Sequence, residues 1–390
     1  MKKKILILNY QMLLGGVCIA AKNFIENMKQ DYEIEYMLAK ANGELDNRLP
    51  KDVAVSYIPY PLNLAARGKK ECTTSGMKIF VDKTIMWLIA NVFHSPCSAR
   101  RTCKHIKNEK QYDIVINNDM DASLRRVGAC HAYAKHVAKA PIKVLILHGD
   151  FIANNYDVKF FKKEYIPSYN YIAVLSNALK KQLEELFPKS KDKFIVIPNF
   201  AAVDEIKALS NEMDISFDRK TLNIVSASRL VEVKAIMRSL RVFKRLRDEG
   251  FDFCWNILGE GEQRPEIEEF IKENKLENNV KLLGLQKNPY PYMKEADLLY
   301  LGSYHESYGL VLIESMICGK PVVTTNTISA KEIVDEKYGW ICDNDEEGIY
   351  NTFKFIIENP KELESKTNNL KKYEFDNKSI KKKYDDLIGR

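Results

Sequence analysis

Short apolar segments alternate with longer segments in which apolar residues recur every three or four positions along the chain. Strands that are covered on both faces read as continuous apolar runs, so the short segments predict buried parallel strands. In the first half the predicted strands are residues 4–8, 113–116, 143–147, 171–175 and 194–197. In the second half they are residues 222–226, 253–258, 280–283, 298–301 and 321–324.

Repeated strand and helix units predict an α/β fold with two successive doubly wound parallel sheets. Helical patterns separate the strands, as in 235–248 and 264–274, and the polar stretch 204–220 separates the two series. We therefore expect one domain over 1–200 and a second over 201–372. Ligands of such sheets bind beyond the carboxyl ends of the strands, so the loops that follow the strands are the candidates for chemistry.

Length and composition agree with two folded domains. The chain has 390 residues, of which 45% are hydrophobic and 29% are charged, so it can bury substantial cores and is not expected to be disordered. Its eight cysteines are scattered, without a C-x-x-C pair or a Cys/His cluster. The sequence therefore predicts no metal site and reduced thiols, which suits a cytoplasmic protein.

The N-terminus imitates a lipoprotein signal, because three lysines precede an apolar run and Cys18 follows. The polar residues Asn9 to Gln11 interrupt that run, and Val17 stands where cleavage requires a small side chain, so a first buried strand is the favoured interpretation. No apolar stretch reaches the roughly 18 residues that a transmembrane helix needs.

Charge is distributed unevenly between the two halves. Residues 1–200 carry 31 Lys and Arg against 19 Asp and Glu, whereas residues 201–390 carry 29 against 34. The basic excess is densest in 62–110, with 10 basic and 3 acidic residues, where large apolar side chains over 79–93 are interleaved. Two interpretations stay open: a surface that docks on anionic lipid, or a core-packed helix with a solvated basic face. Nucleic acid is not expected, because no recognised binding module accompanies the charge.

Two loops carry candidate anion-binding residues. Gly15 and Gly16 stand between a strand and a helix, where glycines let a ligand approach the backbone and the helix N-terminus favours an anion. Arg229 and Lys234 follow the first strand of the second domain, and their cationic groups can hold one diphosphate. Taken alone, the glycine pair is equally typical of a ligand-free turn. Arg229 and Lys234, taken alone, would be interpreted as solvated residues at a helix start.

The strongest pattern runs from Ser303 to Val323. Glu306 lies in a loop after a predicted strand, Gly309 stands at a predicted helix start, and Glu314 lies eight residues after Glu306 inside an apolar helix. Both carboxylates can accept hydrogen bonds from hydroxyls of one elongated ligand, while N–H groups near Gly309 meet phosphate. A surface role does not explain an acid in so apolar a helix.

In these motifs the chain resembles the retaining GT-B glycosyltransferases of family 4, also called glycosyl transferases group 1. The resemblance covers residues 221–330 closely, and the first domain only in its glycine loop, His148-Gly149-Asp150 and overall plan. It rests on Arg229 with Lys234, the E-x7-E element from Glu306 to Glu314, Gly319-Lys320-Pro321-Val322-Val323 and Gly259-Glu260-Gly261. The family implies two Rossmann-like domains that face a cleft, with the C-terminal segment 373–390 crossing back onto the first domain.

The resemblance also implies roles for individual residues. Arg229 and Lys234 would hold the donor diphosphate, Glu306 would hold the transferred sugar, and His148 would lie near the reacting carbon. Glu314 would bind the ribose and Gly16 would approach the phosphates. Further donor contacts are implied for Gly15, Gly259, Gly261, Leu283, Ser307, Tyr308, Gly309 and Leu310. Ala235 departs from the family, which usually has glycine after the lysine, so the start of the next helix is expected to differ slightly.

The implied function is a hexosyltransferase of bacterial cell-surface polysaccharide biosynthesis, such as capsule synthesis. It would move a sugar from a nucleotide donor, expected to be a UDP-sugar, to a glycan or lipid-linked acceptor, without cofactor or metal, at the inner face of the membrane. The alternatives are a GT-B-fold sugar-nucleotide epimerase and a non-catalytic partner protein. Asp119-Met120-Asp121 resembles a D-x-D metal site but is interpreted as a polar loop, and His131 and His136 are interpreted as structural.

Overall fold

The computed structural model describes residues 2–12, 15–40, 49–59, 62, 96–118 and 127–389. Residues 119–121, and all of 63–95 within the basic region, lie outside the described residues. The chain divides into two compact units, which we describe separately. Unit 1 comprises Met1–Phe200 and Asn377–Arg390, and unit 2 comprises Ala201–Asp376.

Unit 1 contains a parallel sheet whose strand order is β3-β2-β1-β4-β5-β6-β7. The strands are β1 (Lys4–Asn9), β2 (Glu33–Leu38), β3 (Ala54–Tyr57), β4 (Ile114–Asn117), β5 (Ile142–Leu147), β6 (Tyr171–Val174) and β7 (Phe194–Val196). Five of them match predicted strands, whereas β2 and β3 were missed. Charged residues interrupt the apolar pattern of β2, because it lies near the edge of the sheet, where Glu35 accepts hydrogen bonds from Lys110 and Tyr112.

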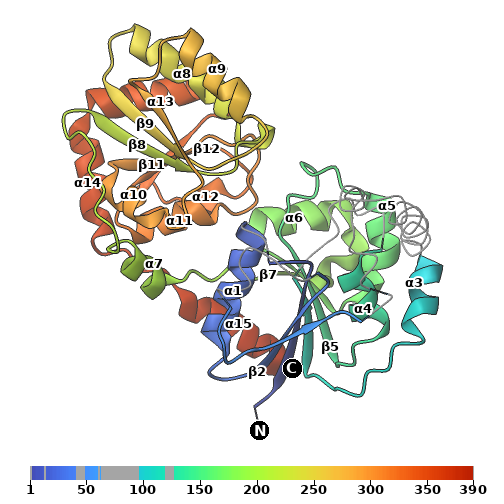
Figure 1. The fold of residues 1–390 in the computed structure, drawn as a ribbon. Helices are drawn as coiled ribbons and strands as arrows, with labels where there is room; N and C mark the ends of the chain where they lie inside the picture. The colour runs from blue at the N-terminus through green and yellow to red at the C-terminus, as the bar shows by residue number, and fades with distance from the viewer. Residues whose placement is uncertain are drawn as a thin grey trace, which may run out of the picture. The chain divides into compact units, whose positions relative to one another are not determined.

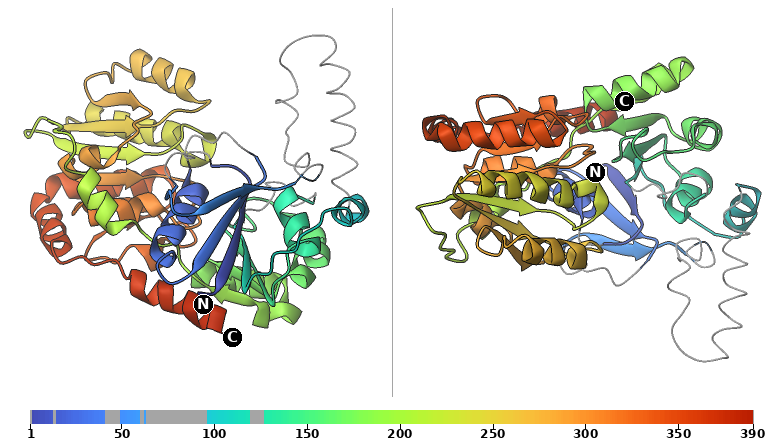
Figure 2. Two further views of the ribbon diagram at one scale, coloured as in Figure 1. Left: turned by 60° about the horizontal axis from the view of Figure 1, so that its bottom comes forward. Right: turned by 90° about the horizontal axis from the view of Figure 1, so that it is seen from above.

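The helices in the described part of unit 1 are α1 (Gly16–Met28), α3 (Pro96–Cys103), α4 (Ala129–His136), α5 (Val158–Phe160), α6 (Asn177–Leu186) and α15 (Asn377–Gly389). The C-terminal helix α15 lies beside α1, and the two ends of the chain lie close together (Figures 1 and 2). The ring of Tyr384 packs 4.8 Å from that of Phe24 and 5.7 Å from that of Phe200, measured between centroids. Lys3 donates a hydrogen bond to the carbonyl of Ile388 at 2.7 Å. Residues from both ends of the chain therefore share one core.

Unit 2 contains a parallel sheet whose strand order is β10-β9-β8-β11-β12-β13. The strands are β8 (Leu222–Ala227), β9 (Phe253–Leu258), β10 (Val280–Gly284), β11 (Leu298–Leu301), β12 (Val322–Thr325) and β13 (Gly339–Cys342). All but the edge strand β13 were predicted. The rings of Trp255 and Phe243 stack 4.7 Å apart, and Phe353 packs against both Phe243 and Tyr300, so aromatic side chains fill this core.

Helices cover both faces of the sheet of unit 2, with α8, α9 and α13 on one face and α10, α11 and α12 on the other (Figure 1). The helices of unit 2 are α7 (Val203–Leu209), α8 (Ile236–Asp248), α9 (Arg264–Glu273), α10 (Tyr290–Glu295), α11 (Leu310–Ile317), α12 (Ala330–Ile333), α13 (Glu346–Glu358) and α14 (Pro360–Leu370). The stretch 204–220, expected to be a polar separator, contributes to α7.

Both sheets reverse their strand order at one point, between β1 and β4 in unit 1 and between β8 and β11 in unit 2. The connections before and after such a point leave toward opposite faces, so the loops at the carboxyl ends of the two strands diverge and leave room for a ligand. The loops after β1 and β4, and those after β8 and β11, therefore occupy the positions where this architecture binds ligands.

Across the described residues, no helix has the length and apolar composition that crossing a bilayer requires.

Candidate active site

The loops after β8 and β11 bring opposite charges together in unit 2. Lys234 ends a short 3₁₀ segment, Glu232–Lys234, and Glu306 follows β11. The Lys234 Nζ atom lies 2.5 Å from Glu306 Oε2, and the two side chains are 17% and 20% exposed. Ser303 Oγ also donates to Glu306 Oε2, at 3.4 Å. Both charged groups are thus oriented yet remain accessible to a ligand, while Arg229 in the same β8 loop is exposed.

The loop that carries Glu306 is fixed through its backbone carbonyl groups. The carbonyl of Gly302 accepts from Arg238 Nη2 at 2.7 Å, and that of Ser303 accepts from Thr325 Oγ1 at 2.6 Å. The carbonyls of Tyr304 and Ser307 accept from Asn344 Nδ2 at 2.9 Å and Ser329 Oγ at 2.7 Å. The Tyr304 N–H donates to the carbonyl of Val233 at 2.9 Å, which joins this loop to the one that carries Lys234. The backbone contacts leave the Glu306 carboxylate for other partners.

Buried Arg238 supports this loop from the first turn of α8. Its guanidinium donates to the carbonyls of Gly302 and Asn344 and to Asn344 Oδ1, and it lies 4.3 Å from the centroid of the Tyr304 ring. These acceptors are neutral oxygens, so Arg238 adds positive charge behind the loop. Sequence analysis missed Arg238, Asn344, Thr325 and Ser329, because a role that is carried by backbone carbonyls leaves no motif.

Two residues with left-handed backbone conformation begin the helices at this site. Gly309 precedes α11 with φ 73° and ψ 53°, and Ala235 precedes α8 with φ 53° and ψ 35°. The first N–H groups of a helix have no acceptor within it and favour an anion. Ala235 thus adopts the left-handed conformation that glycine adopts readily, which strains a residue with a Cβ atom.

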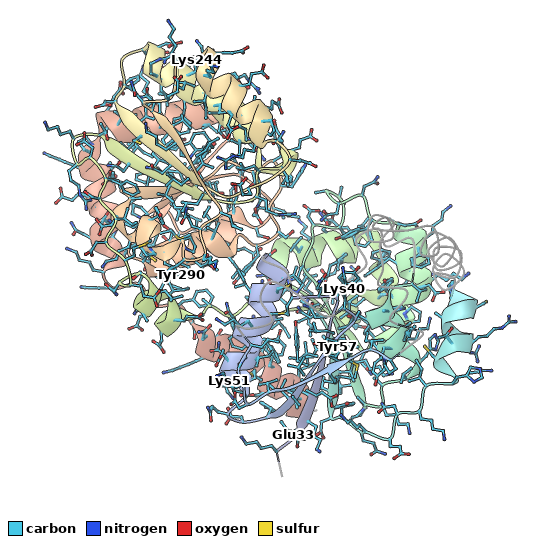
Figure 3. The ribbon with its side chains drawn as sticks, viewed as in Figure 1. Glu33, Lys40, Lys51, Tyr57, Lys244 and Tyr290 are labelled. Atoms are coloured by element: carbon cyan, nitrogen blue, oxygen red, sulfur yellow. The ribbon has the colours of Figure 1, made fainter. Side chains whose placement is uncertain are left out.

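Glu314 lies on α11 and is only 9% exposed. Burial raises the pKa of its carboxyl to about 7, a hydrogen bond with Tyr290 lowers it, and the charge of Glu205 raises it. Tyr290 begins α10 (Figure 3), and Glu205 lies on α7. The second carboxylate of the E-x7-E element is therefore held among three helices, which distinguishes its surroundings from those of Glu306.

Gly259 and Gly261 pack directly against the β8 loop. A Cβ atom on Gly259 would collide with the carbonyl of Ser228, and one on Gly261 would collide with that of Leu230. The Gly259 N–H donates to the carbonyl of Gly284 at 2.8 Å, which places the loop after β9 beside the end of β10, where Leu283 is half-buried. Glycine is required at both positions because the two backbones approach closely. This close approach positions the residues around Arg229.

Gly15 and Gly16, at the start of α1 in unit 1, have different surroundings. Apart from the chain neighbours and the backbone of α1 itself, no described residue lies within 4 Å of a Cβ atom built on either glycine. Packing within the described part of unit 1 therefore does not demand glycine at these two positions. Their small size keeps the N-terminus of α1 open to close approach by a ligand.

His148 follows β5 in unit 1. Its Nε2 atom lies 3.0 Å from Asn118 Oδ1, and burial lowers the pKa of the imidazole to about 4. The imidazole is therefore neutral near pH 7. Gly15, Gly16 and His148 belong to unit 1, whereas the other predicted site residues belong to unit 2, including Ser307, Tyr308 and Leu310 beside Gly309.

The other histidines that were singled out do not join a cluster of metal ligands. His131 is buried, and its Nδ1 atom lies 3.0 Å from the hydroxyl of Tyr169. Burial lowers the pKa values of His131, to about 3, and of His136. Among the described residues, no three His, Cys, Asp or Glu side chains come together as a metal site would require.

The match to a known protein family lies in unit 2. Residues 210–373 match the family model described as "Glycosyl transferases group 1". The chain is 31% identical over 217 residues to an N-acetylgalactosamine-N,N'-diacetylbacillosaminyl-diphospho-undecaprenol 4-alpha-N-acetylgalactosaminyltransferase of Campylobacter jejuni, with 54% of this chain and 58% of the relative covered. It is 27% identical to an uncharacterized glycosyltransferase of Methanocaldococcus jannaschii, with 58% of this chain and 59% of the relative covered. The matches thus span less than two thirds of these relatives.

Solved structures share the architecture over the whole chain. HepE of Anabaena, in complex with UDP and glucose, superposes with a TM-score of 0.71 at 17% identity, with 99% of both chains covered. TarM of S. aureus superposes with a TM-score of 0.73 at 14% identity, with 100% of this chain and 99% of that chain covered. At these identities the likeness establishes the fold, which is the two-domain α/β fold that was predicted.

Proposed function

Because this chain belongs to the group 1 glycosyltransferases, with the GT-B fold, we propose that it transfers a sugar from a UDP-sugar to a glycan or lipid-linked acceptor. The observation that carries the proposal is the meeting of Lys234 and Glu306 where the strand order of unit 2 reverses. A cation for phosphate and a carboxylate for hydroxyls stand side by side, as recognition of a nucleotide sugar requires. HepE, which shares the fold, was crystallised with UDP and glucose, and this supports the choice of donor.

The roles proposed for unit 2 follow from charge and exposure. Exposed Arg229 and partly exposed Lys234 hold the diphosphate and stabilise the charge that develops on the departing UDP. Glu306 accepts hydrogen bonds from hydroxyls of the transferred sugar. Two cations provide the charge compensation that a divalent ion provides in other transferases, so we propose that the reaction needs neither metal nor cofactor.

The remaining roles concern the ribose, the phosphates and the reacting carbon. Glu314 binds the ribose, Gly16 lets the phosphates approach the start of α1, and neutral His148 contacts the sugar. We favour retention by attack on the face from which UDP departs, with a phosphate oxygen accepting the acceptor's proton. This route needs no protein nucleophile, and the sequence names no convincing one.

The acceptor and the location of the enzyme are argued from relatives and charge. The Campylobacter relative is named for a diphospho-undecaprenol-linked acceptor, which supports a lipid-linked acceptor and a place in cell-surface polysaccharide synthesis. Such an acceptor places the enzyme at the inner face of the membrane, with the basic region 62–110 on anionic lipid. Of that region, the described Arg100 and Arg101 on α3 are exposed. Substituting Lys69, Lys70, Arg100 and Arg101 with serine should reduce co-sedimentation with anionic vesicles, and unchanged co-sedimentation would exclude this docking surface.

The proposed function is tested by UDP release from purified protein in the presence of a chelator. A panel of UDP-sugars is supplied, each with and without a lipid or glycan extract as acceptor. Release from one donor that rises with added acceptor is expected, and it would identify the sugar. Interconversion of the donor without UDP release would instead favour an epimerase. Tight UDP binding without turnover of any donor would favour a non-catalytic partner protein.

A further inference from the structure

Three polar side chains, two of them buried, connect the start of α1 to the loop after β5 in unit 1. Asn9 is the last residue of β1, Asn118 follows β4, and His148 follows β5, so all three stand at the carboxyl edge of the sheet beside its reversal point. Asn9 is fully buried and Asn118 is 4% exposed. Buried side-chain amides are costly unless their hydrogen bonds are formed, so their orientation is determined by their neighbours.

The orientation of the Asn118 amide follows from a backbone carbonyl. One polar atom of this amide lies 3.4 Å from the carbonyl oxygen of Val17, in the first turn of α1. A carbonyl oxygen can only accept, so this atom is Nδ2. The second hydrogen of Nδ2 is directed to Asn9 Oδ1, also at 3.4 Å.

The orientation of the Asn9 amide also follows from a backbone carbonyl. Its Nδ2 atom donates to the carbonyl of Gln11 at 3.4 Å, and this contact turns Asn9 Oδ1 toward Asn118. Two backbone carbonyls, those of Gln11 and Val17, therefore determine both amides. In this arrangement Asn118 Oδ1 is the atom that faces His148.

The imidazole must then donate through Nε2, because a side-chain amide oxygen can only accept. A neutral imidazole carries one proton, so Nδ1 is left with its lone pair. Nδ1 has no hydrogen-bond partner among the residues that the structure describes. Because burial keeps the imidazole neutral near pH 7, this state holds under ordinary conditions.

We propose that Asn118 is a positioning residue that holds His148 in the tautomer protonated at Nε2, so that Nδ1 accepts a hydrogen bond from a hydroxyl of the bound sugar. The contact with sugar rests on the proposed function, whereas the tautomer does not. The same amide nitrogen holds the carbonyl of Val17, next to Gly15 and Gly16. Asn118 thus ties the histidine to the loop at which phosphate is expected.

The tautomer is tested on the full-length protein labelled with [15N]histidine. Two-dimensional spectra that correlate ring nitrogens with ring protons distinguish a protonated from an unprotonated nitrogen, and His148→Gln assigns the signals among the six histidines. We expect a protonated Nε2 and an unprotonated Nδ1 in the unmodified protein at pH 8. Asn118→Ala should remove this preference, and Asn118→Asp, which keeps an acceptor beside Nε2, should restore it. A proton on Nδ1 in the unmodified protein would overturn the proposal.

Kinetics of the same variants test the consequence for turnover. Asn118→Ala should lower kcat about tenfold, on the scale of one hydrogen bond, with little change in the Kd for UDP, and Asn118→Asp should recover part of the loss. The matched control is Asn108→Ala, which removes an amide that donates to the carbonyl of Val137 instead, and it should leave both unchanged. If Asn118→Ala loses the tautomer preference of His148 but keeps its kcat, the proposed contact between His148 Nδ1 and the sugar is wrong. If no donor is turned over at all, the proposed function fails while the spectra still decide the tautomer.

Discussion

Lys234 and Glu306 are 72 residues apart in sequence, yet their charged atoms lie 2.5 Å apart. The pair forms because β8 and β11 are hydrogen-bonded neighbours and each residue lies in the loop that follows its strand. Each side chain restrains the other before a ligand arrives, which reduces the conformational entropy lost on binding. A diphosphate and a sugar hydroxyl would provide the two groups with new partners.

Removing the Glu306 carboxylate should separate binding of UDP from transfer of the sugar. Glu306→Ala should reduce transfer at least a hundredfold, because a charged hydrogen bond to the reacting sugar is lost. The Kd for UDP, measured by calorimetry, should stay the same or fall, because Lys234 loses a carboxylate that competes with phosphate. A tenfold weaker affinity for UDP would contradict the placement of Glu306 on the sugar side.

Arg229→Ala should instead weaken UDP binding itself. Charge-assisted hydrogen bonds to phosphate contribute about 1.5 to 3 kcal/mol, so the Kd should rise roughly ten- to a hundredfold. Arg241→Ala is the matched control, since Arg241 is an exposed arginine of the same unit that pairs with Glu346 on the surface. Equal affinity of the Arg229 and Arg241 variants, measured by the same titration, would remove Arg229 from the diphosphate site.

Ala235→Gly should stabilise unit 2. Ala235 is 3% exposed and has φ 53°, a conformation that costs an L-residue with a Cβ atom about 1 to 2 kcal/mol. Glycine removes this strain but adds flexibility to the unfolded chain, so a net gain of about 0.5 to 1 kcal/mol is expected in the free energy of unfolding by urea.

A second alanine of unit 2 provides the control for this substitution. Ala296 is fully buried and has φ −64°, which any residue adopts, so Ala296→Gly should only destabilise. Destabilisation of similar size in both variants would show that Ala235 is not strained.

The fold was largely predictable because most strands of both sheets are covered on both faces. Strands such as β1 and β11 contain continuous apolar runs, and their position in the sequence follows directly. The missed strands β2, β3 and β13 lie at or next to a sheet edge. Glu33 and Glu35 interrupt the apolar pattern of β2, and β3 and β13 span only four residues each. Predicting them required knowledge of their neighbours in space.

The candidate site was predictable only where a side chain itself meets the ligand. Lys234 and Glu306 belong to a recognisable pattern, and the structure brings them together. Arg238 and Asn118 act through a backbone carbonyl or another side chain, and a single arginine or asparagine gives no such signal in sequence. The surroundings of Glu314 likewise depend on α7 and α10, which approach it only in the folded chain.

Glu314 should make the stability of unit 2 depend on pH. Its carboxyl has a pKa raised to about 7 from an ordinary value of 4.5, chiefly by burial. The folded state therefore binds the proton more tightly than the unfolded state, and its stabilisation is complete below pH 4.5 and is lost as the pH rises to 7. Over this window the contribution of Glu314 to the free energy of unfolding should fall by about 3 kcal/mol.

Glu314→Gln tests this prediction, because glutamine cannot ionise at this position. Urea unfolding of both proteins from pH 5 to 8 should show the unmodified protein losing stability relative to the variant as the pH rises. Glu266→Gln, an exposed position on α9, is the control and should give a curve parallel to that of the unmodified protein. A constant difference between the Glu314 variant and the unmodified protein would mean that Glu314 is ionised throughout. The buried carboxyl would then need a compensating cation or a larger set of hydrogen bonds than Tyr290 provides.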